Sequence, residues 1–456
     1  MAYRSRRWSE FVAVIALLLL AIGAGPAFAQ DVPPGGADAK TSSAFATVQA
    51  HIVETLGIET AQLKPETDLI RDLKLDRSLV YYVLEDLYEA IGVMAPEKEL
   101  TRLGEIAAYV ESAPPAIKIS RKGLPAKSPG TAKTYVQTVY FATNRKATGK
   151  RDPADAFSGQ RAKGGQVRYG KVEVNIPASH KRGQLESPLL HIKALRDSKK
   201  HIYVLKLDGL DAAGFFSQVA ASGSGRDDII VYIHGFNVTF DAALRRAAQI
   251  AFDFQFKGTP IVFTWPSDGS LKSYNADWED VLWSVKHIER FLSQLSEELP
   301  GRKIHLIAHS MGNKGLLYAL RLLAYRKASA AMFGSVILCA PDFDADLFIS
   351  QIAEEIRPFA DQWIVYSSKN DFALILSEQI NAAPRLGTPV AIAEGFQIID
   401  ASEIEVTPWS VPETHSYYAT KKRVLDDMVS ALKGLRPEQR GLRAFTSDAG
   451  QFWVLR

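Results

Sequence analysis

Cysteine is almost missing from this chain, since Cys339 is the single cysteine among 456 residues. A lone cysteine cannot form an internal disulfide, and its place in an apolar run predicts a small buried hydrophobic side chain. The sequence also lacks His, Cys, Asp and Glu residues at metal-ligand spacing, and it has no Gly-Lys phosphate loop. We therefore expect no disulfide framework, no metal site and no cofactor.

A large excess of charge is absent as well. The formal net charge is +3, and three arginines near the start precede the apolar run Phe11–Ala24 and an Ala-Phe-Ala cleavage pattern. This order predicts a secretory signal peptide over residues 1–29, cleaved after Ala29, although a retained anchor is the alternative. Cleavage would remove those arginines and Glu10 and leave a net charge of +1. We expect an exported, periplasmic or secreted protein that does not bind nucleic acid.

Composition divides the rest of the chain into five parts. Residues 30–44 are rich in Pro, Gly, Ala and Ser, which predicts a flexible leader. Residues 45–112 have helical periodicity, and the Pro-, Lys- and Gly-rich residues 113–133 predict a linker. Residues 134–435 form the largest domain, and residues 436–456 are interpreted as a polar tail with an apolar end.

The largest domain alternates strand-like and helical patterns. Its early strand-like runs are more alternating and suit an antiparallel edge, whereas the later runs are continuously apolar and predict buried parallel strands. The expected strands are Thr138–Ala142, Val167–Ile176, His201–Leu207, Ile229–Ile233, Ile261–Thr264, Lys303–Ala308, Ser335–Cys339, Trp363–Ser367 and Phe396–Ile399. The expected helices are Ala242–Phe254, Trp278–Leu299, Met311–Lys327, Ala345–Glu355 and Arg423–Leu432. This is an α/β pattern: a mostly parallel sheet covered by helices on both faces.

One of these strands leads into a candidate nucleophile. The sequence KIHLIAHSMG places Ser310 between Ala308 and Gly312, after a buried strand and before a helix. A sharp strand-to-helix turn needs small residues two positions before and after the serine, because a larger side chain would clash with neighbouring chain. Ala308 stands where glycine is commoner and keeps that requirement.

Several pieces together resemble a bacterial α/β-hydrolase family of uncharacterised esterase- and lipase-like proteins. They are VYFATNRK, YGKVEVNIP, VYIHGFNVTF, FTWPSDGS, HLIAHSMGN, LCAPDFDAD, YSSKNDFAL and HSYY. The resemblance implies the α/β-hydrolase fold, a serine nucleophile and hydrolysis of an acyl ester. It implies no particular substrate.

In α/β-hydrolases the catalytic triad follows the chain order serine, acid, histidine. His415 is the only histidine after Ser310 and lies in a polar loop beyond the last predicted strand, so we expect it to be the base. Asp371, at the end of the preceding strand, is the favoured acid, and Asp342 is the alternative.

The tetrahedral intermediate of such a reaction needs N–H donors. Met311, directly after the serine, is one expected backbone donor. The sequence His234-Gly235 is similar to the His-Gly of lipase oxyanion loops, which makes Phe236 the other expected donor.

The helical residues 45–112 resemble an acyl carrier protein, chiefly through DLKLDRSLVYYVLEDLYEAIG at 72–92. Carrier proteins attach phosphopantetheine to the serine of Asp-Ser-Leu. Here Arg77 follows Asp76 and the serine is displaced to Ser78, which a helix would turn by about 100° away from the usual face. The resemblance therefore implies a carrier-like fold without the prosthetic group; an unrelated three-helix bundle is the alternative.

These observations predict an exported serine hydrolase that cleaves carboxylic esters of small molecules or lipids through an acyl-enzyme intermediate. Thioester or amide cleavage would use the same residues. A non-catalytic envelope protein that binds a partner through its helical domain is the hypothesis from another class. Acyl-chain length, a lid and the oligomeric state are left open by the sequence.

Overall fold

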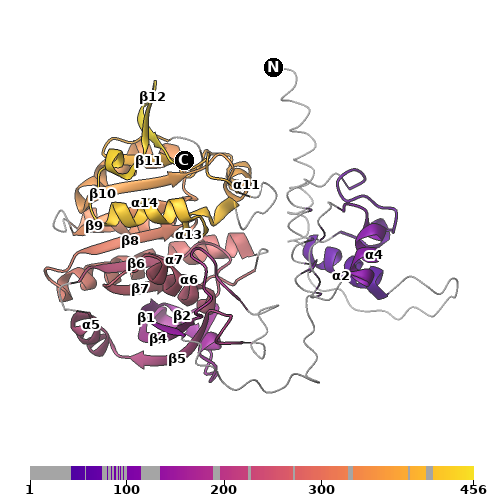
Figure 1. The fold of residues 1–456 in the computed structure, drawn as a ribbon, viewed down its shortest axis with the longest axis horizontal. Coiled ribbons are helices and arrows are strands. Elements are labelled where there is room, and N and C mark those ends of the chain that lie inside the picture. Colours follow the sequence, from indigo (N-terminus) through magenta and orange to yellow (C-terminus); the bar gives the residue numbers. More distant parts are fainter. Residues whose placement is uncertain are drawn as a thin grey trace. The chain divides into compact units, whose positions relative to one another are not determined.

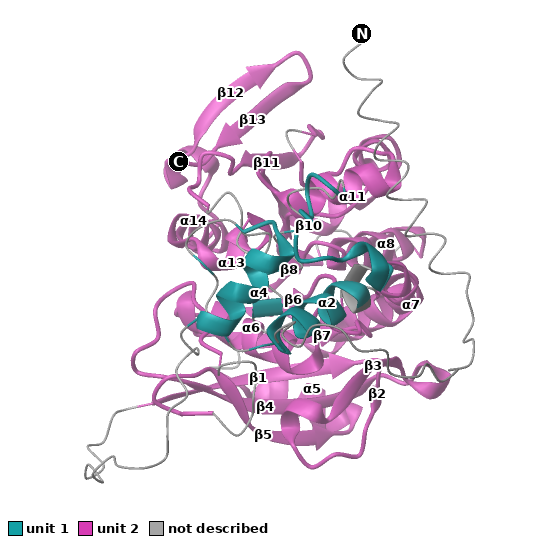
Figure 2. Ribbon diagram, turned by 90° about the vertical axis from the view of Figure 1, so that its right-hand side faces the viewer, with its two compact units in different colours: residues 1–127 teal, residues 128–456 magenta. Residues whose placement is uncertain are grey.

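The computed structural model describes two compact units, which comprise residues 1–127 (unit 1) and residues 128–456 (unit 2), coloured separately in Figure 2. The described residues are 43–56, 58–73, 80, 84, 87, 88, 91, 93, 96, 100–113, 134–187, 196–223, 227–270, 273–326, 332–388, 391–406 and 414–456. The predicted signal peptide, nearly all of the leader and linker, and the Asp76–Ser78 segment lie outside them. No helix among these residues is long and apolar enough to cross a bilayer.

Unit 1 contains the helices α2 (Ser43–Leu56) and α4 (Leu103–Ser112) and the short helix η1 (Thr60–Gln62). The apolar positions expected from helical spacing gather in one core. Its buried members are Phe45, Val48, Ile52, Leu63, Leu69, Val80, Leu84, Leu87, Tyr88, Leu103, Ile106 and Ala107. The small N-terminal helical part of the fold prediction is therefore confirmed.

Unit 2 is built on an 11-stranded sheet in the described part of the chain. The strand order is β12-β13-β11-β10-β9-β8-β6-β7-β1-β4-β5, and Figure 1 shows the sheet with β12 at the top and β5 at the bottom. These strands are β1 (Tyr135–Thr143), β4 (Arg168–Ile176), β5 (Tyr203–Leu210), β6 (Ile229–Ile233), β7 (Thr259–Thr264), β8 (Ile304–His309), β9 (Phe333–Cys339), β10 (Ala360–Ser367), β11 (Phe396–Asp400), β12 (Arg443–Ser447) and β13 (Gly450–Val454). A separate pair consists of β2 (Arg145–Ala147) and β3 (Phe157–Arg161).

The pairing of the strands defines one edge where loops meet. Strands β1, β7, β6, β8, β9, β10, β11 and β13 are parallel, while β4, β5 and β12 run antiparallel to their neighbours. The chain goes from β6 to β7 on one side and then returns to β8 on the other side of β6. A parallel sheet opens a crevice at the carboxyl ends of its strands where the strand order reverses in this way. The loops after β6 and β8 therefore border that crevice.

Helices cover both faces of the sheet, as the alternation of buried side chains requires. Along β8, Leu306 belongs to one core cluster and Ile307 to the other. The first cluster takes side chains from α5 (Ala212–Ala221), α7 (Tyr274–Glu298), α8 (Gly312–Tyr325) and α10 (Ala353–Ile356). The second takes them from α6 (Phe240–Asp253), α11 (Phe372–Asn381), α13 (Tyr417–Thr420) and α14 (Lys422–Leu432). Cys339 is buried and free, as predicted.

The C-terminal segment differs from the prediction. Residues 436–456 do not form a tail: β12 and β13 form a hairpin, and β13 pairs in parallel with β11, as Figure 2 shows. The side chains of β12 are all exposed, which explains why the segment reads as polar. The segment is held against the sheet by its buried apolar end, Trp453, Val454 and Leu455. The predicted helix Ala345–Glu355 also differs, because α9 (Ala345–Leu347) and α10 are joined by a π-helical turn, Phe348–Ile352.

Candidate active site

Ser310 lies on the sharp turn between β8 and α8 that the sequence predicts. Its φ of 51° is in the left-handed region, which costs a residue with a Cβ on the order of 1–2 kcal/mol. Neighbouring strands hold this backbone in place, because the Ser310 N–H donates to the carbonyl of Cys339 at the end of β9 (3.0 Å). Asn313 caps the turn from the other side, with its side-chain amide donating to the Ser310 carbonyl (3.0 Å). The serine is thus fixed at the carboxyl edge of the sheet and is 4% exposed.

Two glycines permit the close approach of the β6 loop to this turn. A Cβ on Gly235 would lie 2.8 Å from the Cβ of Ser310 and 2.9 Å from Nδ1 of His309. A Cβ on Gly312 would collide with the backbone carbonyl of His234. The spacing of small residues that predicts the turn therefore has a steric cause in the structure. The loop after β6 packs directly on the serine.

His415 and Asp371 form a hydrogen-bonded pair. The Nδ1–H of His415 donates to both carboxylate oxygens of Asp371, at 2.9 and 2.8 Å. The His415 side chain is 15% exposed, whereas that of Asp371 is completely buried. Burial lowers the pKa of His415, but the charge and hydrogen bond of Asp371 and the charge of Asp342 outweigh it, so this pKa stands above its usual value.

His309 connects the His415 loop with the serine turn. Its ring packs against those of His415 (centroids 4.6 Å apart) and Tyr418 (4.3 Å), and its Nε2–H donates to the His415 carbonyl (3.1 Å). Burial, and then the charge of His415, hold the pKa of His309 well below its usual range, so its ring is neutral. Among the described hydrogen bonds the Ser310 hydroxyl has none to His415, a contact that often tightens only with substrate bound.

Asp342, the alternative acid, has other partners. It accepts hydrogen bonds from the Tyr274 hydroxyl (2.9 Å) and the Ser377 hydroxyl (2.5 Å), and Arg385 lies 3.7 Å away. Its backbone N–H donates to the Ser310 carbonyl (3.3 Å). The structure thus places Asp342 next to the serine turn and pairs Asp371 with the histidine.

One expected oxyanion donor follows Ser310 in the chain, and the other is in the loop after β6. Met311 is completely buried and directly precedes α8, and Phe236 is in the β6 loop that Gly235 brings against the serine. Within the described residues neither backbone N–H has a hydrogen-bond acceptor. Buried N–H groups without an acceptor are rare in folded proteins. Both donors are therefore free to bind an oxygen atom of a ligand.

A buried arginine that the sequence analysis did not single out holds the β6 and β7 loops together. Arg145 is completely buried and donates to the carbonyls of Val238 (2.6 Å) and Ser267 (2.8 Å) and to the hydroxyl of Thr264 (2.8 Å). Its burial lowers its pKa to about 9, against the opposing charge of Asp277. The loops after β6 and β7 are thereby hydrogen-bonded to one side chain. The β6 loop also contains Phe236, one of the expected oxyanion donors. The sequence signal for it is the motif ATNRK at the end of β1.

We expect Arg145 to act as a positioning residue for the β6 loop. Replacing Arg145 with lysine removes the planar fork that reaches three acceptors at once, so kcat for ester hydrolysis should fall about tenfold or more while KM changes little. The measurement is steady-state kinetics well below the unfolding temperature of the variant. Arg161→Lys, which alters a more exposed ion pair with Asp280, is the matched control. Equal kcat values for the two variants would contradict the positioning role.

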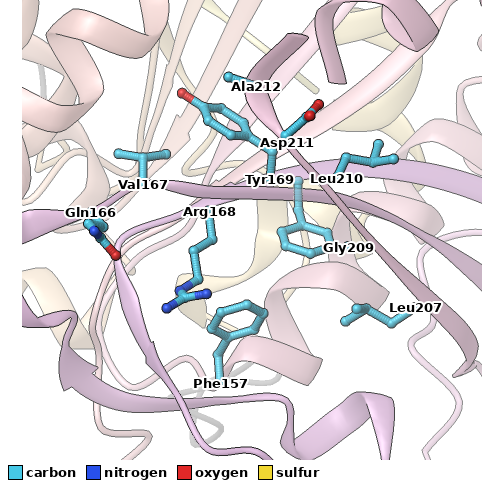
Figure 3. Close-up of a pocket in the computed structure, with 11 residues that line it drawn as sticks. Phe157, Gln166, Val167, Arg168, Tyr169, Leu207, Gly209, Leu210, Asp211 and Ala212 are labelled. Atoms are coloured by element: carbon cyan, nitrogen blue, oxygen red, sulfur yellow. The ribbon is translucent and has the colours of Figure 1, made fainter. Parts of the chain in front are cut away.

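A hollow elsewhere in unit 2 is unrelated to these residues. Figure 3 shows it, with a volume of about 560 Å³ and a lining that includes Phe157, Arg168, Tyr169 and Asp211. It lies at the antiparallel end of the sheet, on β4 and β5, and none of the candidate site residues lines it. In the described part of the chain, no group of three or more His, Cys, Asp or Glu residues could hold a metal ion.

Similarity to known proteins agrees with this division of the chain. Residues 216–434 match the family described as "Alpha/beta hydrolase of unknown function (DUF900)". An uncharacterized protein of Nostoc sp. is 28% identical over 120 residues, which are 21% of this chain and 31% of that protein. The acyl carrier protein of Helicobacter pylori (strain G27) is 31% identical over 70 residues, which are 15% of this chain and 90% of the carrier protein. The chain thus spans about a third of its Nostoc relative.

Solved structures similar to this chain include esterases. Brefeldin A esterase, described as a bacterial homologue of human hormone sensitive lipase, shares 11% identity at a TM-score of 0.27 and is matched over 86% of this chain and 83% of its own. An uncharacterized protein from Bacillus cereus shares 11% identity at a TM-score of 0.30, over 46% of this chain and 60% of its own. At these TM-scores the likeness places no individual residue. The family match confirms the predicted α/β-hydrolase fold for residues 216–434, and about 70 residues of the chain belong to the acyl carrier protein family.

Proposed function

We propose that unit 2 is a serine hydrolase that cleaves carboxylic esters, with Ser310 as nucleophile, His415 as base and Asp371 as the acid of a triad. The observation that carries the proposal is the short hydrogen bond from His415 to the completely buried Asp371. The loop that contains His415 is also hydrogen-bonded to His309, the residue before the strained Ser310. A carboxylate that holds a histidine beside a strained serine is the arrangement that makes a hydroxyl nucleophilic.

The reaction would proceed in two steps. The Ser310 oxygen attacks the ester carbonyl as Nε2 of His415 accepts the hydroxyl proton, and the negative oxygen that forms is stabilised by the N–H groups of Phe236 and Met311. His415 then gives its proton to the leaving alcohol, and the acyl group remains on the serine. Water, deprotonated by the same histidine, releases the carboxylic acid and restores the hydroxyl. Asp371 stabilises the imidazolium in both steps, in agreement with the raised pKa of His415.

Ester, thioester and amide cleavage use the same residues, so the proposal includes a choice among these three bonds. The oxygen ester is favoured because the family resemblance implies it. Rates on an oxygen ester, a thioester and an amide with the same acyl group would rank the three. We propose in addition that the chain is exported, as its predicted signal peptide indicates, and that its substrate is a small-molecule or lipid ester.

The carrier-protein relationship of unit 1 favours a second candidate function, in which unit 1 docks a protein partner of the envelope and unit 2 serves as a scaffold. A scaffold does not need a charge-assisted His–Asp pair next to a strained serine. Purified protein that turns over no short-chain nitrophenyl ester, but binds a specific partner through unit 1, would favour this function instead.

Labelling with a fluorophosphonate tests the proposed nucleophile. This probe reacts with activated serine hydroxyls, and we expect one modified peptide, carrying the probe on Ser310. The Ser310→Ala variant should not be labelled, and Ser335→Ala, which alters a buried serine on β9, should be labelled like the wild type. Labelling that persists in Ser310→Ala would end the assignment.

A further inference from the structure

Lys314 is a buried cation one helical turn after Ser310. It lies in the first turn of α8, where its N–H donates to the Met311 carbonyl (3.0 Å), and the residue is 3% exposed. Lysine is almost never buried to this degree without a partner. Neither the proposed triad nor the oxyanion donors account for its charge.

No carboxylate in the described residues forms an ion pair with Lys314. The nearest acidic groups are already engaged: Asp342 accepts hydrogen bonds from Tyr274 and Ser377 and lies near Arg385, while Asp344 accepts the N–H of Leu347 at the start of α9 (2.9 Å). The ammonium group lies instead over the ring of Trp278 in α7. A ring face attracts a cation, but it does not accept the three hydrogen bonds that an ammonium group can donate.

The surroundings of Lys314 are those of the candidate active site. The Tyr274 ring packs against that of Phe236 (centroids 5.4 Å apart), and Trp278 lies one turn further along α7 (6.1 Å from Tyr274). The backbone of Asp342 bonds to Ser310 itself. Phe236, Tyr274 and Trp278 are each partly exposed, so this row of aromatic side chains, which ends at the lysine, has access to solvent. The ring that Lys314 contacts is thus linked through Tyr274 to Phe236, the residue expected to donate to the oxyanion.

We infer that Lys314 binds an anionic group of the substrate, a carboxylate or a phosphate, and that the enzyme prefers esters with a negative charge near the scissile bond. The inference rests on the proposed ester hydrolysis and adds the class of substrate. An anion would give the ammonium group the hydrogen-bond acceptors that the protein does not supply.

The electrostatic surroundings of Lys314 agree with this role. Burial lowers the pKa of Lys314 to about 7, although the charges of Asp342 and Asp344 oppose the effect and that of Arg385 adds to it. An anion next to the amine would favour its protonated form. The anionic group of the substrate would thus form an ion pair with the Lys314 ammonium group.

Matched esters test the inference. The acyl-side pair is mono-p-nitrophenyl glutarate against p-nitrophenyl butyrate, and the alcohol-side pair is 1-butyrylglycerol 3-phosphate against 1-butyrylglycerol. We expect kcat/KM of the wild type to be about 10- to 100-fold higher for the anionic member of one pair, which tells carboxylate from phosphate. Lys314→Met should lose this preference, measured as the ratio of kcat/KM between the two members of a pair, and Lys314→Arg should keep part of it. Lys303→Met, which removes an exposed lysine paired with Asp361, is the charge-matched control.

The possible failures are distinguishable. Turnover of the neutral esters without preference for either anionic ester would overturn the inference and leave the ester hydrolase standing. If no ester is turned over, calorimetric titration of Ser310→Ala with glutarate and with glycerol 3-phosphate decides, compared with the Ser310→Ala/Lys314→Met variant. Binding of one anion that depends on Lys314 supports the anion site, and equal or absent binding in both variants refutes it.

Discussion

Replacing His415 with glutamine is expected to lower kcat for a nitrophenyl ester about 10⁶-fold, to the level of Ser310→Ala. Glutamine retains much of the size and polarity of the side chain but cannot take up the serine proton. The Asp371 carboxylate would still receive a hydrogen bond from the amide, so the fold should persist. Stopped-time assays at high enzyme concentration, with circular dichroism to verify folding, measure the effect.

A double variant tests most directly whether Ser310 and His415 act together. If Ser310 and His415 act as one unit, Ser310→Ala/His415→Gln should be no slower than either single variant, because each already removes the whole effect. His287→Gln, which changes a half-buried histidine of α7 that is outside the proposed triad, should keep wild-type kinetics. Multiplying losses in the double variant would mean that the two side chains act independently, and the triad would be wrong.

The substitution Asp371→Asn should lower kcat about 10⁴-fold with little loss of stability. Asp371 has two tasks in the structure: it accepts the hydrogen bond of His415, and it caps α11 by accepting the Leu374 N–H (3.1 Å). Asparagine caps a helix as well as aspartate does. It cannot stabilise a positive imidazolium, and its amide favours the wrong tautomer of the ring. Activity and stability should therefore separate, with kcat measured beside the thermal unfolding midpoint.

Asp342→Asn is the matched comparison, since it removes the carboxylate that the sequence analysis gave as the alternative acid. Its partners are Tyr274, Ser377 and Arg385, so we expect a fall in stability and less than about a tenfold loss in kcat for neutral esters. A larger loss of kcat in Asp342→Asn than in Asp371→Asn would make Asp342 the acid of the reaction.

The central strands could be predicted from sequence because both of their faces are buried. All residues of β6 and β8 are buried, and the apolar runs that mark such strands begin and end within about one residue of the observed bounds. The edge elements carry a weaker signal. All side chains of β12 are exposed, and in α11 only Leu374 and Ser377 are buried, so neither shows a clear apolar pattern.

The residues proposed for the triad were predictable because chain order and strand ends restrict them. The sequence favoured Asp371 over Asp342 as the acid but left Asp342 as the alternative, because both residues follow parallel strands at the same edge of the sheet. Only their partners in space separate the two. Arg145 and Lys314 were missed. Neither stands out in the sequence, where Arg145 is followed directly by Lys146, and only the fold reveals that both residues are buried.

The backbone angle of Ser310 has a consequence for attempts to make this protein more heat-resistant. Asn237 (φ 57°) and Ala340 (φ 43°), which follow β6 and β9, share its left-handed conformation at the same edge of the sheet. Each such residue costs on the order of 1 kcal/mol, out of roughly 5–15 kcal/mol of net folding stability. Selection for thermal tolerance alone would therefore favour glycine at all three positions. Glycine at position 310 would relieve the backbone strain but would also remove the Ser310 nucleophile. A screen for robust variants should retain ester turnover as a second criterion.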